Sequence, residues 1–479
     1  MLLEQTLQQI FGYDTFRPGQ KEVIEQLLEG RDCIALLPTG MGKSLCYQLP
    51  GYLFEKPVLI VSPLLSLMQD QVDQLKQRGE KRVVALNSFL SPNEKAYALH
   101  FLHEYRFIFT SPEMLTQQPV RERLMEMELS LIVADEAHCI SQWGFDFRPD
   151  YLRINEILQP NRPPILALTA TATDSVLADI QTYLHMKEPY QFIHHVDREN
   201  IKLAKYTFSL KEEKQHWILQ HVTSTKGPGI IYMPSRKKCD EFSQLLIERG
   251  ISAVSYHAGK EAEDRQFIQQ QFIQGDVEWI VATNAFGMGV HKHNIRQVIH
   301  ESMPANISNY MQEIGRAGRD GEDALAILLY AEGDEHYAHY VSIEDLPKSA
   351  HVDAYVQRLQ LQENPKIMLE TGEISETAYR VLAYWMQQEA PQAVKKRLTQ
   401  MEAAKYQAVQ EMLQIIDTSN CMRRQLVQYF GQKLTAVHAI CCSNCGFHIR
   451  DVTESRELLQ PQKTMQWEER LRKLLFGRN

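Results

Sequence analysis

The sequence has no apolar run long enough to span a bilayer. The first residues, Met1 to Gln5, carry no basic region, so they do not resemble a secretory signal and are expected to start a helix. We also find no internal repeat and no low-complexity tract. A cytoplasmic protein without a membrane partner is therefore expected, and in that reducing compartment the eight cysteines are thiols or metal ligands rather than disulfides.

An excess of positive charge is also missing. The net charge is −9, which argues mildly against a nucleic-acid partner, although a binding groove needs only a local stripe of Lys and Arg. The content of 44% hydrophobic and 23% charged residues is that of an ordinary globular protein. At 479 residues the chain is too long for one core, and roughly two to four domains are expected.

A glycine-rich loop follows the apolar run Cys33–Leu37 and leads into a helical pattern from Leu45. Glycines in such a loop let backbone N–H groups close around phosphates, while Lys43 reaches the terminal phosphates and the Ser44 hydroxyl meets Mg²⁺. Leu37 stands where a full motif has its first glycine, but the shorter form is usual in helicase-type motors. The residues predicted to hold the nucleotide here are Thr39, Gly40, Met41, Gly42, Lys43 and Ser44.

A second acidic motif follows the apolar run Leu129–Ala134, which has the length of a buried parallel strand. Asp135 at the end of this run is expected to hold Mg²⁺, and Glu136 to orient and deprotonate the attacking water. Either motif alone is compatible with an ordinary glycine turn or an unrelated acidic strand end. Both in this order predict a nucleoside triphosphatase.

Strand-like and helical patterns alternate along two stretches, which predicts two α/β domains in tandem with a junction near residue 200. The strands expected in the first are Cys33–Leu37, Val58–Val61, Val83–Leu86, Phe107–Phe109, Leu131–Ala134 and Ile165–Leu168. Those expected in the second are Gly229–Met233, Ile251–Tyr256, Trp279–Ala282, Val298–Glu301 and Ala324–Tyr330. A helical stretch without chemical motifs follows, in which Ser375 is expected to cap a helix whose apolar face includes Val381, Leu382 and Trp385.

With these motifs in place, the chain from Phe11 to His448 resembles the RecQ family of superfamily 2 DNA helicases. The segment Phe11–Gln20 resembles the part of these enzymes that reads adenine. The resemblance implies that Tyr13 stacks on the base, that Gln20 hydrogen-bonds its edge and that Arg17 joins this site. Without the family, the same stretch is only a helix entry with a proline near its start.

The resemblance also implies loops that hold single-stranded DNA. Two of them contain Ser62 with Pro63 and Thr110 with Ser111, although as bare sequence these are ordinary strand-to-helix turns. The segment 141–151 resembles the aromatic-rich loop that separates RecQ helicases from DEAD-box RNA helicases. Its expected DNA contacts are Trp143, Phe147 and Arg148, because bases stack on aromatic rings and arginine meets phosphates. Phe145 stands where the family usually has His.

The second domain resembles the family's arginine-finger segment at Gln312–Gly321. The resemblance implies Arg319 as the finger on the γ-phosphate, Arg316 as its companion and Gln312 as a further nucleotide contact. The alternative is an arginine pair on a solvated face. Two positions depart from the family. The family commonly has an Asp that contacts the sugar of the nucleotide where this chain has His291, and a Pro at the domain junction where this chain has Glu199.

A zinc site is expected near the C-terminus, where the segment resembles the RecQ zinc module. The expected ligands are Cys421, Cys442, Cys445 and His448, the last standing where the family has Cys, with Cys441 as a spare ligand if the register shifts. Four protein ligands leave no open position, so the role would be structural. The alternative is four free thiols.

The predicted fold class is therefore α/β, with two tandem RecA-like domains, a helical segment and a zinc module. The expected boundaries are 1–200, 201–340, 341–420, 421–450 and a tail at 451–479. The resemblance describes a short form that lacks the winged-helix and terminal helical domains. The segment 341–420 is then either a packing insert or, with Lys395–Arg397, part of a replacement DNA surface.

The function implied by the resemblance is that of a 3′-to-5′ DNA helicase in repair and recombination, with ATP, Mg²⁺ and structural Zn²⁺. Single-stranded and partly duplex DNA are its expected partners, with single-strand-binding protein and repair factors as further candidates and a monomer as the expected state. Two alternatives stay open at this point. One is a translocase or RNA-acting motor that rarely unwinds duplex, and the other is a nucleic-acid-binding adaptor with a weakened nucleotide site.

Overall fold

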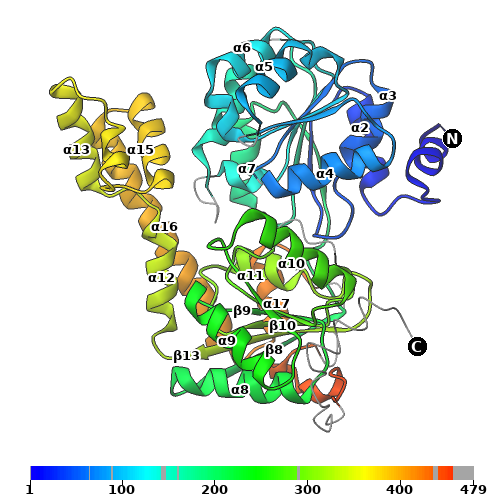
Figure 1. Ribbon diagram of the computed structural model, residues 1–479, viewed down its shortest axis with the longest axis vertical. Helices are drawn as coiled ribbons and strands as arrows, with labels where there is room; N and C mark the ends of the chain where they lie inside the picture. The colour runs from blue at the N-terminus through cyan, green and yellow to red at the C-terminus, as the bar shows by residue number, and fades with distance from the viewer. Residues whose placement is uncertain are drawn as a thin grey trace, which may run out of the picture.

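The computed structural model describes residues 2–63, 65–87, 90–141, 147–158, 161–287, 292–434 and 441–456. Two α/β domains lie one above the other, and an arm of helices rises beside them from the second domain (Figure 1). Within the described residues, no helix combines the length and the apolar character that crossing a membrane requires.

The first domain is built on a parallel sheet of seven strands in the order β3-β4-β2-β5-β6-β1-β7. Most of these strands are buried at every position, because helices cover both faces of the sheet. The strands are β1 (Cys33–Leu36), β2 (Val58–Val61), β3 (Val83–Leu86), β4 (Phe107–Thr110), β5 (Leu131–Ala134), β6 (Ile165–Thr169) and β7 (Tyr190–Ile193). The helices are α1 (Leu2–Thr6), α2 (Gln20–Leu28), α3 (Leu45–Leu53), α4 (Leu65–Gln77), α5 (Pro92–His100), α6 (Gln118–Met125) and α7 (Asp174–Tyr183), with 3-10 turns at η4 (Ala137–Ile140) and η5 (Pro149–Ile157).

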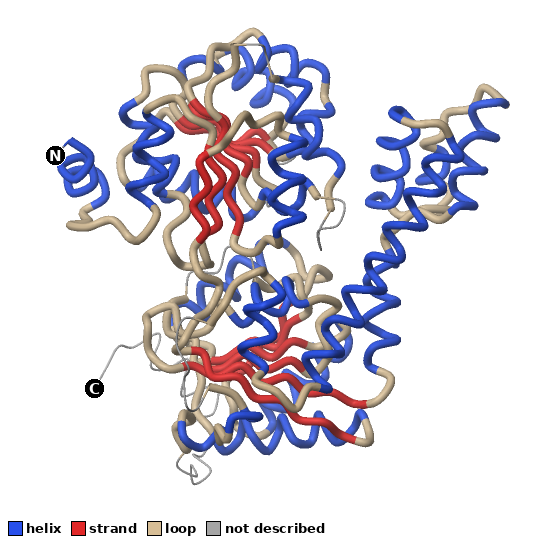
Figure 2. Tube along the Cα trace, turned by 180° about the vertical axis from the view of Figure 1, so that it is seen from behind, coloured by secondary structure: helices blue, strands red, loops and turns tan. Residues whose placement is uncertain are grey.

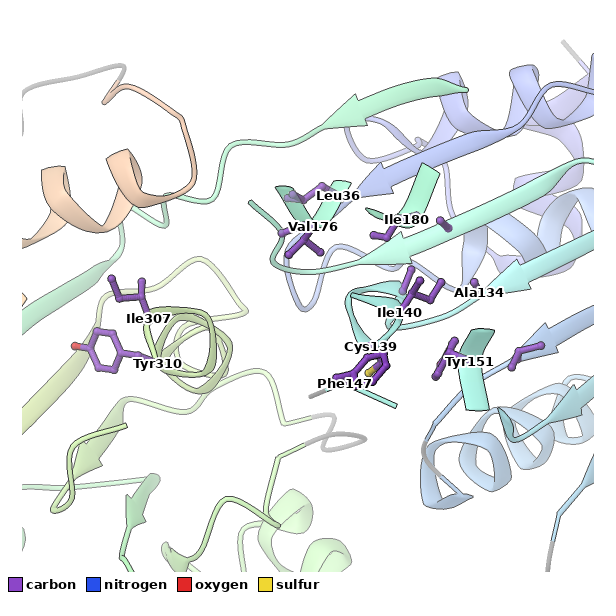
Figure 3. Packing of buried hydrophobic residues seen from close by; sticks show 14 of the residues in the cluster. Leu36, Ala134, Cys139, Ile140, Phe147, Tyr151, Val176, Ile180, Ile307 and Tyr310 are labelled. Carbon is purple, nitrogen blue, oxygen red and sulfur yellow. The ribbon is translucent and has the colours of Figure 1, made fainter. Parts of the chain in front are cut away.

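The second domain repeats this architecture with six parallel strands in the order β10-β11-β9-β12-β13-β8. The strands are β8 (Ile201–Phe208), β9 (Gly229–Tyr232), β10 (Ala253–Tyr256), β11 (Trp279–Ala282), β12 (Gln297–His300) and β13 (Ala324–Ala331). The helices are α8 (Lys211–Ser224), α9 (Arg236–Glu248), α10 (Ala262–Gln274) and α11 (Ile307–Ile314). Figure 3 shows buried side chains of both domains, with Ala134, Ile140 and Tyr151 in the first and Ile307 and Tyr310 in the second.

The sheets confirm the predicted α/β class, and every stretch predicted as a strand contains one. The sequence reading missed β7 and β8, which lie at the edges of the two sheets. Along β7, half-buried and exposed residues alternate, and β8 carries Lys202 and Lys205 between its apolar positions. Neither strand therefore has the continuous apolar run that identifies a central parallel strand.

The arm consists of α12 (Asp334–Glu344), α13 (Ser349–Gln360), α14 (Ile367–Glu370), α15 (Glu376–Gln388) and α16 (Pro391–Asp417). Ser375 caps α15 as predicted, since its hydroxyl accepts a hydrogen bond from the Ala378 N–H at 3.2 Å. Helix α16 runs from the tip of the arm back to the second domain (Figures 1 and 2). At the tip, α15 packs on η5 of the first domain, so the arm contacts both domains.

A small C-terminal module follows α16. It contains α17 (Met422–Tyr429) and the short turns η6 (Ser443–Cys445) and η7 (Ile449–Asp451). Beyond it, the chain lies beside the stretch between α8 and β9, where the Lys226 N–H donates to the Glu454 carbonyl at 3.0 Å. Phe447 and Ile449 extend the core of the second domain, so this module is part of that domain's packing.

Candidate nucleotide and DNA site

The phosphate loop lies between β1 and α3, as the sequence predicted. Gly40 and Gly42 have φ values of +91° and +75°, a conformation that favours glycine. A Cβ atom at Gly42 would come within 2.8 Å of Nε2 of Gln20, so any larger residue there would displace the Gln20 amide from the loop.

The residues expected to read adenine contact this loop. Nε2 of Gln20 donates to the carbonyls of Met41 and Gly42 at 2.9 and 3.1 Å, and its Oε1 accepts from the Arg17 N–H at 2.9 Å. Arg17 donates to the Gly40 carbonyl. In the structure the Gln20 amide thus holds the loop, while Tyr13 is 51% exposed at the mouth of the same cavity.

Three charged groups meet beneath the loop. Nζ of Lys43 donates to Oε1 of Glu136 at 3.0 Å, and Oδ1 of Asp135 accepts from the Glu136 N–H at 3.0 Å. Burial and the neighbouring Glu136 raise the pKa of Asp135 to about 6. Burial opposes ionisation of Glu136 as well, but Lys43 and His138 hold the pKa of Glu136 below its ordinary value. Glu136 is therefore kept as a carboxylate, the form that accepts a proton from water.

The second domain supplies the opposite wall. A Cβ atom at Gly40 would lie 3.2 Å from Cγ of Arg319, so the Arg319 stem rests on the phosphate loop across the domain junction. Arg316 donates to the Gly287 carbonyl beside it. Burial and the nearby Arg316 and Arg198 lower the pKa of Arg319 to about 9. A buried cation, Arg316, and a half-buried one, Arg319, thus face the loop, where the charge of a triphosphate would compensate them.

One cavity of about 460 Å³ joins these groups. Of the residues predicted for ATP, only Met41 is not part of its lining. Sequence reasoning missed several polar residues of this wall, because they follow ordinary helical spacing or stand in a loop: Gln71 and Gln74 of α4, Arg78 directly after it, and His293. The members that were predicted are Tyr13, Arg17, Gln20, Thr39, Gly40, Gly42, Lys43, Ser44, Asp135, Glu136, Gln312, Arg316 and Arg319.

The predicted DNA loops are placed differently. Ser62, Thr110 and Ser111 are at most 3% exposed, and Ser62 donates to Asp135 at 3.5 Å. These hydroxyls therefore point into the first domain rather than toward a strand on its surface. Pro63 is also buried, and its carbonyl accepts from Arg148 at 3.0 Å.

The aromatic-rich loop differs from its prediction as well. Trp143 and Phe145 lie outside the described residues, as does His291. Phe147 is only 9% exposed, and its ring stacks on Trp385 of α15 with centroids 6.4 Å apart. The expectation that Phe147 offers an open stacking face is corrected here, because the arm covers it.

The zinc site is corrected at its fourth ligand. The sulfur atoms of Cys421, Cys441, Cys442 and Cys445 all lie within 4.8 Å of one another. His448 is exposed instead. The reason is packing: Phe447 and Ile449 on either side are buried in the second domain, so the residue between them faces outward. Four thiolates at this spacing fit a tetrahedral Zn²⁺ ion, and such a site has a structural role.

Comparisons with known proteins agree with this geometry. Three family models match in order: DEAD/DEAH box helicase at residues 17–180, helicase conserved C-terminal domain at 213–321, and RecQ zinc-binding at 379–447. The probable ATP-dependent DNA helicase RecS of Bacillus subtilis (strain 168) is 41% identical over 459 residues, which cover 93% of this chain and 92% of that protein. The chain belongs to the RecQ family of superfamily 2 helicases.

Other RecQ relatives are longer. The ATP-dependent DNA helicase RecQ of Pasteurella multocida (strain Pm70) is 36% identical over 464 residues, which cover 96% of this chain but 64% of that protein. Among solved structures, the DUF1998 helicase MrfA bound to DNA matches 71% of this chain and 52% of that chain, with a TM-score of 0.58 and 19% identity. S. cerevisiae Dbp5 bound to RNA and ADP BeF3 matches 71% of this chain and 90% of that chain, with a TM-score of 0.57 and 17% identity. These two structures show the shared two-domain fold, and the RecQ family assignment makes this enzyme an ATP-dependent DNA helicase.

Proposed function

We propose that this RecQ-family helicase couples ATP hydrolysis to 3′-to-5′ movement along single-stranded DNA and so unwinds partly duplex DNA in repair and recombination. One observation carries the proposal: Arg319 of the second domain rests on Gly40 of the phosphate loop in the first. A nucleotide site shared by two domains makes hydrolysis depend on their closure. Opening and closing of the two domains would then move their surfaces relative to each other once for each ATP hydrolysed, which is how a stepping motor advances.

In the proposed reaction, each charged group has one role. The Ser44 hydroxyl and the Asp135 carboxylate would hold Mg²⁺, which neutralises charge on the phosphates. Lys43 binds the terminal phosphates, and Glu136 orients and deprotonates the attacking water. Arg319 stabilises the charge that develops on the γ-phosphate, with Arg316 beside it. Gln312 lines the same cavity and completes the second-domain wall.

The proposed functional units are residues 1–200, which bind the nucleotide, 201–340, which supply the arginines, 341–420, which form most of the arm, 421–450, the zinc module, and 451–479, the tail. The arm begins slightly earlier than the second boundary, because its first helix α12 starts at Asp334. Within the arm, Lys395 pairs with Asp353 at 2.6 Å and Arg397 pairs with Glu389. These pairs favour a packing and bridging role for the arm over a basic DNA surface.

We further propose that the enzyme works as a monomer in the cytoplasm. A monomer is supported by the nucleotide cavity, which residues of one chain line on both sides. A reducing compartment suits a site of four cysteine thiolates. Single-strand-binding protein and repair factors remain the expected protein partners, and analytical ultracentrifugation with and without DNA checks the state.

The first test is steady-state ATP hydrolysis with no nucleic acid, single-stranded DNA, duplex DNA or single-stranded RNA, beside Lys43→Ala. We expect single-stranded DNA to raise turnover many-fold and Lys43→Ala to abolish it. Partial duplexes with either a 3′ or a 5′ single-stranded tail then test direction, and only the 3′-tailed substrate should be unwound.

Each other outcome has a definite meaning. If RNA stimulates ATP hydrolysis as strongly as DNA or more strongly, the enzyme would be a motor that acts on RNA instead of DNA. Stimulation by single-stranded DNA without strand separation would make the enzyme a translocase. DNA binding with negligible turnover would leave only a nucleic-acid-binding adaptor.

A further inference from the structure

We propose that Arg423 of the zinc module is a positioning residue for ATP hydrolysis. It holds the linker between the two domains, and the linker holds the turn that carries the arginine finger. The inference rests on the proposed function, because it assigns Arg319 to the γ-phosphate.

The first contact joins the zinc module to the linker. Arg423 lies in α17, two residues after the zinc ligand Cys421, and is 3% exposed. Its guanidinium pairs with the Asp197 carboxylate and donates to the carbonyls of Arg198, at 2.9 Å, and Ile201. Asp197 and Arg198 belong to the stretch that joins β7 of the first sheet to β8 of the second, and Ile201 is the first residue of β8. A single buried side chain thus fixes the backbone of the hinge.

A second group of contacts holds the start of the linker. Oε1 of Gln432 accepts from the Val196 N–H at 2.9 Å, and its Nε2 donates to the His194 carbonyl at 3.3 Å. Nε2 of His195 donates to the Lys433 carbonyl at 2.9 Å. Arg423 near the start of α17, together with Gln432 and Lys433 after its end, therefore binds the linker from residue 194 to residue 201.

The third contact joins the linker to the finger. Arg198 donates to the Gly318 carbonyl at 2.6 Å, and Nδ2 of Asn200 donates to the same carbonyl at 2.8 Å. Gly318 has a φ of +56°, and a Cβ atom there would lie 2.4 Å from Nδ2 of Asn200. Gly318 stands directly before Arg319, so the linker fixes the peptide from which the finger projects.

These contacts form one continuous path from the zinc module to the nucleotide. Cys421 is also the N-cap residue of α17, so a metal ion bound there would fix the start of the helix that carries Arg423. A cation that stabilises a transition state has to be held within about 0.5 Å of its working position. Arg423 supplies part of that restraint from outside the active site, because it makes the linker adopt one conformation.

The test compares Arg423→Gln with Arg424→Gln, an exposed neighbour on the same helix. We expect Arg423→Gln to lower DNA-stimulated kcat about tenfold while the KM for ATP, the zinc content and the affinity for single-stranded DNA without nucleotide stay within about twofold. Arg424→Gln should match the unaltered enzyme in all four. A loss that is equal in both variants, or an unchanged kcat in Arg423→Gln, would overturn the proposal.

A double-mutant cycle adds a readout that a merely structural role would not move. If Arg423 acts through the linker, combining Arg423→Gln with Arg198→Gln should lower kcat no further than the worse single change. Losses that multiply would contradict the path. If Arg423→Gln does not fold or loses zinc, the variant Asp197→Asn replaces it as the test, because it changes only the linker side of the contact. Asp197→Asn should also lower kcat, and an unchanged kcat there would overturn the proposal. An unaltered enzyme without DNA-stimulated hydrolysis would instead overturn the proposed function.

Discussion

At the scale of single residues, the acidic motif shows how backbone and charge act together. Glu136 has a φ of +49°, a left-handed conformation that is uncommon for a residue with a side chain. This conformation turns the chain sharply at the end of β5, so that Asp135 and Glu136 both reach the phosphate loop. Such a strained backbone conformation persists where contacts with the surroundings stabilise it, and here the ion pair between Lys43 and Glu136 does so.

The zinc ligands allow a direct test of the corrected site. Cys441→Ser should lower zinc affinity at least about tenfold, because the change removes one of four thiolates. His448→Ala should leave zinc content unchanged, since the imidazole lies on the surface. Zinc per chain, measured by atomic absorption after dialysis against a weak chelator, distinguishes them. The opposite pattern would restore His448 as the ligand.

Asp70 on α4 should make stability depend on pH. Burial and the neighbouring Asp73 raise the pKa of Asp70 from 3.8 to about 6. The folded state thus favours the protonated form of Asp70. The contribution of this residue to the free energy of unfolding is therefore fully present below pH 4 and is lost as the pH rises through 6. Asp70→Asn imitates the protonated form and should raise the free energy of unfolding by about 1 kcal/mol at pH 7.5, a value reduced for partial exposure. Urea unfolding at pH 7.5 and pH 4 checks this, and an equal gain at both would contradict it.

At the scale of elements, the arm is the least expected part of the molecule. Its tip reaches the first domain although its root lies in the second. Arg380 of α15 donates to Asp150 of η5 at 3.3 Å, and Trp385 is covered on one side by Phe147 and on the other by Arg397, 3.9 Å from its ring centroid. The arm therefore holds the last part of the aromatic-rich segment, where Phe147 and Asp150 lie.

Removing the central side chain of this contact should destabilise the fold. Trp385 is 5% exposed, so Trp385→Ala should lower the free energy of unfolding by about 3 kcal/mol through the cavity it leaves. Gln387→Ala, an exposed change on the same helix, should have no effect. Urea denaturation followed by tryptophan-independent circular dichroism measures both. Equal stability of the two variants would show that α15 does not pack on Phe147.

At the scale of the whole molecule, the proposed mechanism depends on closure of the two domains. Arg319→Ala should lower DNA-stimulated kcat about a hundredfold or more, because the arginine stabilises charge that develops only in the transition state. The KM for ATP should change little, since Lys43 and the loop supply most of the binding. Steady-state kinetics with saturating single-stranded DNA checks this. A variant in which only KM rises would make Arg319 a binding residue rather than the finger.

Features set by local sequence patterns could be predicted, whereas features set by contacts between distant parts of the chain could not. The phosphate loop and the acidic motif are local patterns, and two central strands of one parallel sheet bring Lys43 and Glu136 together without further information. Burial of Phe147 could not be predicted in this way, because its partner Trp385 is far along the chain. The prediction of the fourth zinc ligand was wrong for a similar reason, because the packing of Phe447 and Ile449 against the second domain decides which way His448 points.

Helix α16 has a mechanical consequence. Its 27 residues span about 40 Å, and within it proline stands only at the first position and glycine is absent. It is thus a stiff rod with its base near the zinc module and its far end near the aromatic-rich loop. A rotation of about 10° at the base displaces the far end by about 7 Å. Because α15 packs on η5 at that far end, a rotation between the two domains has to carry this contact along or break it, and a fluorescent pair placed on α15 and η5 would distinguish the two.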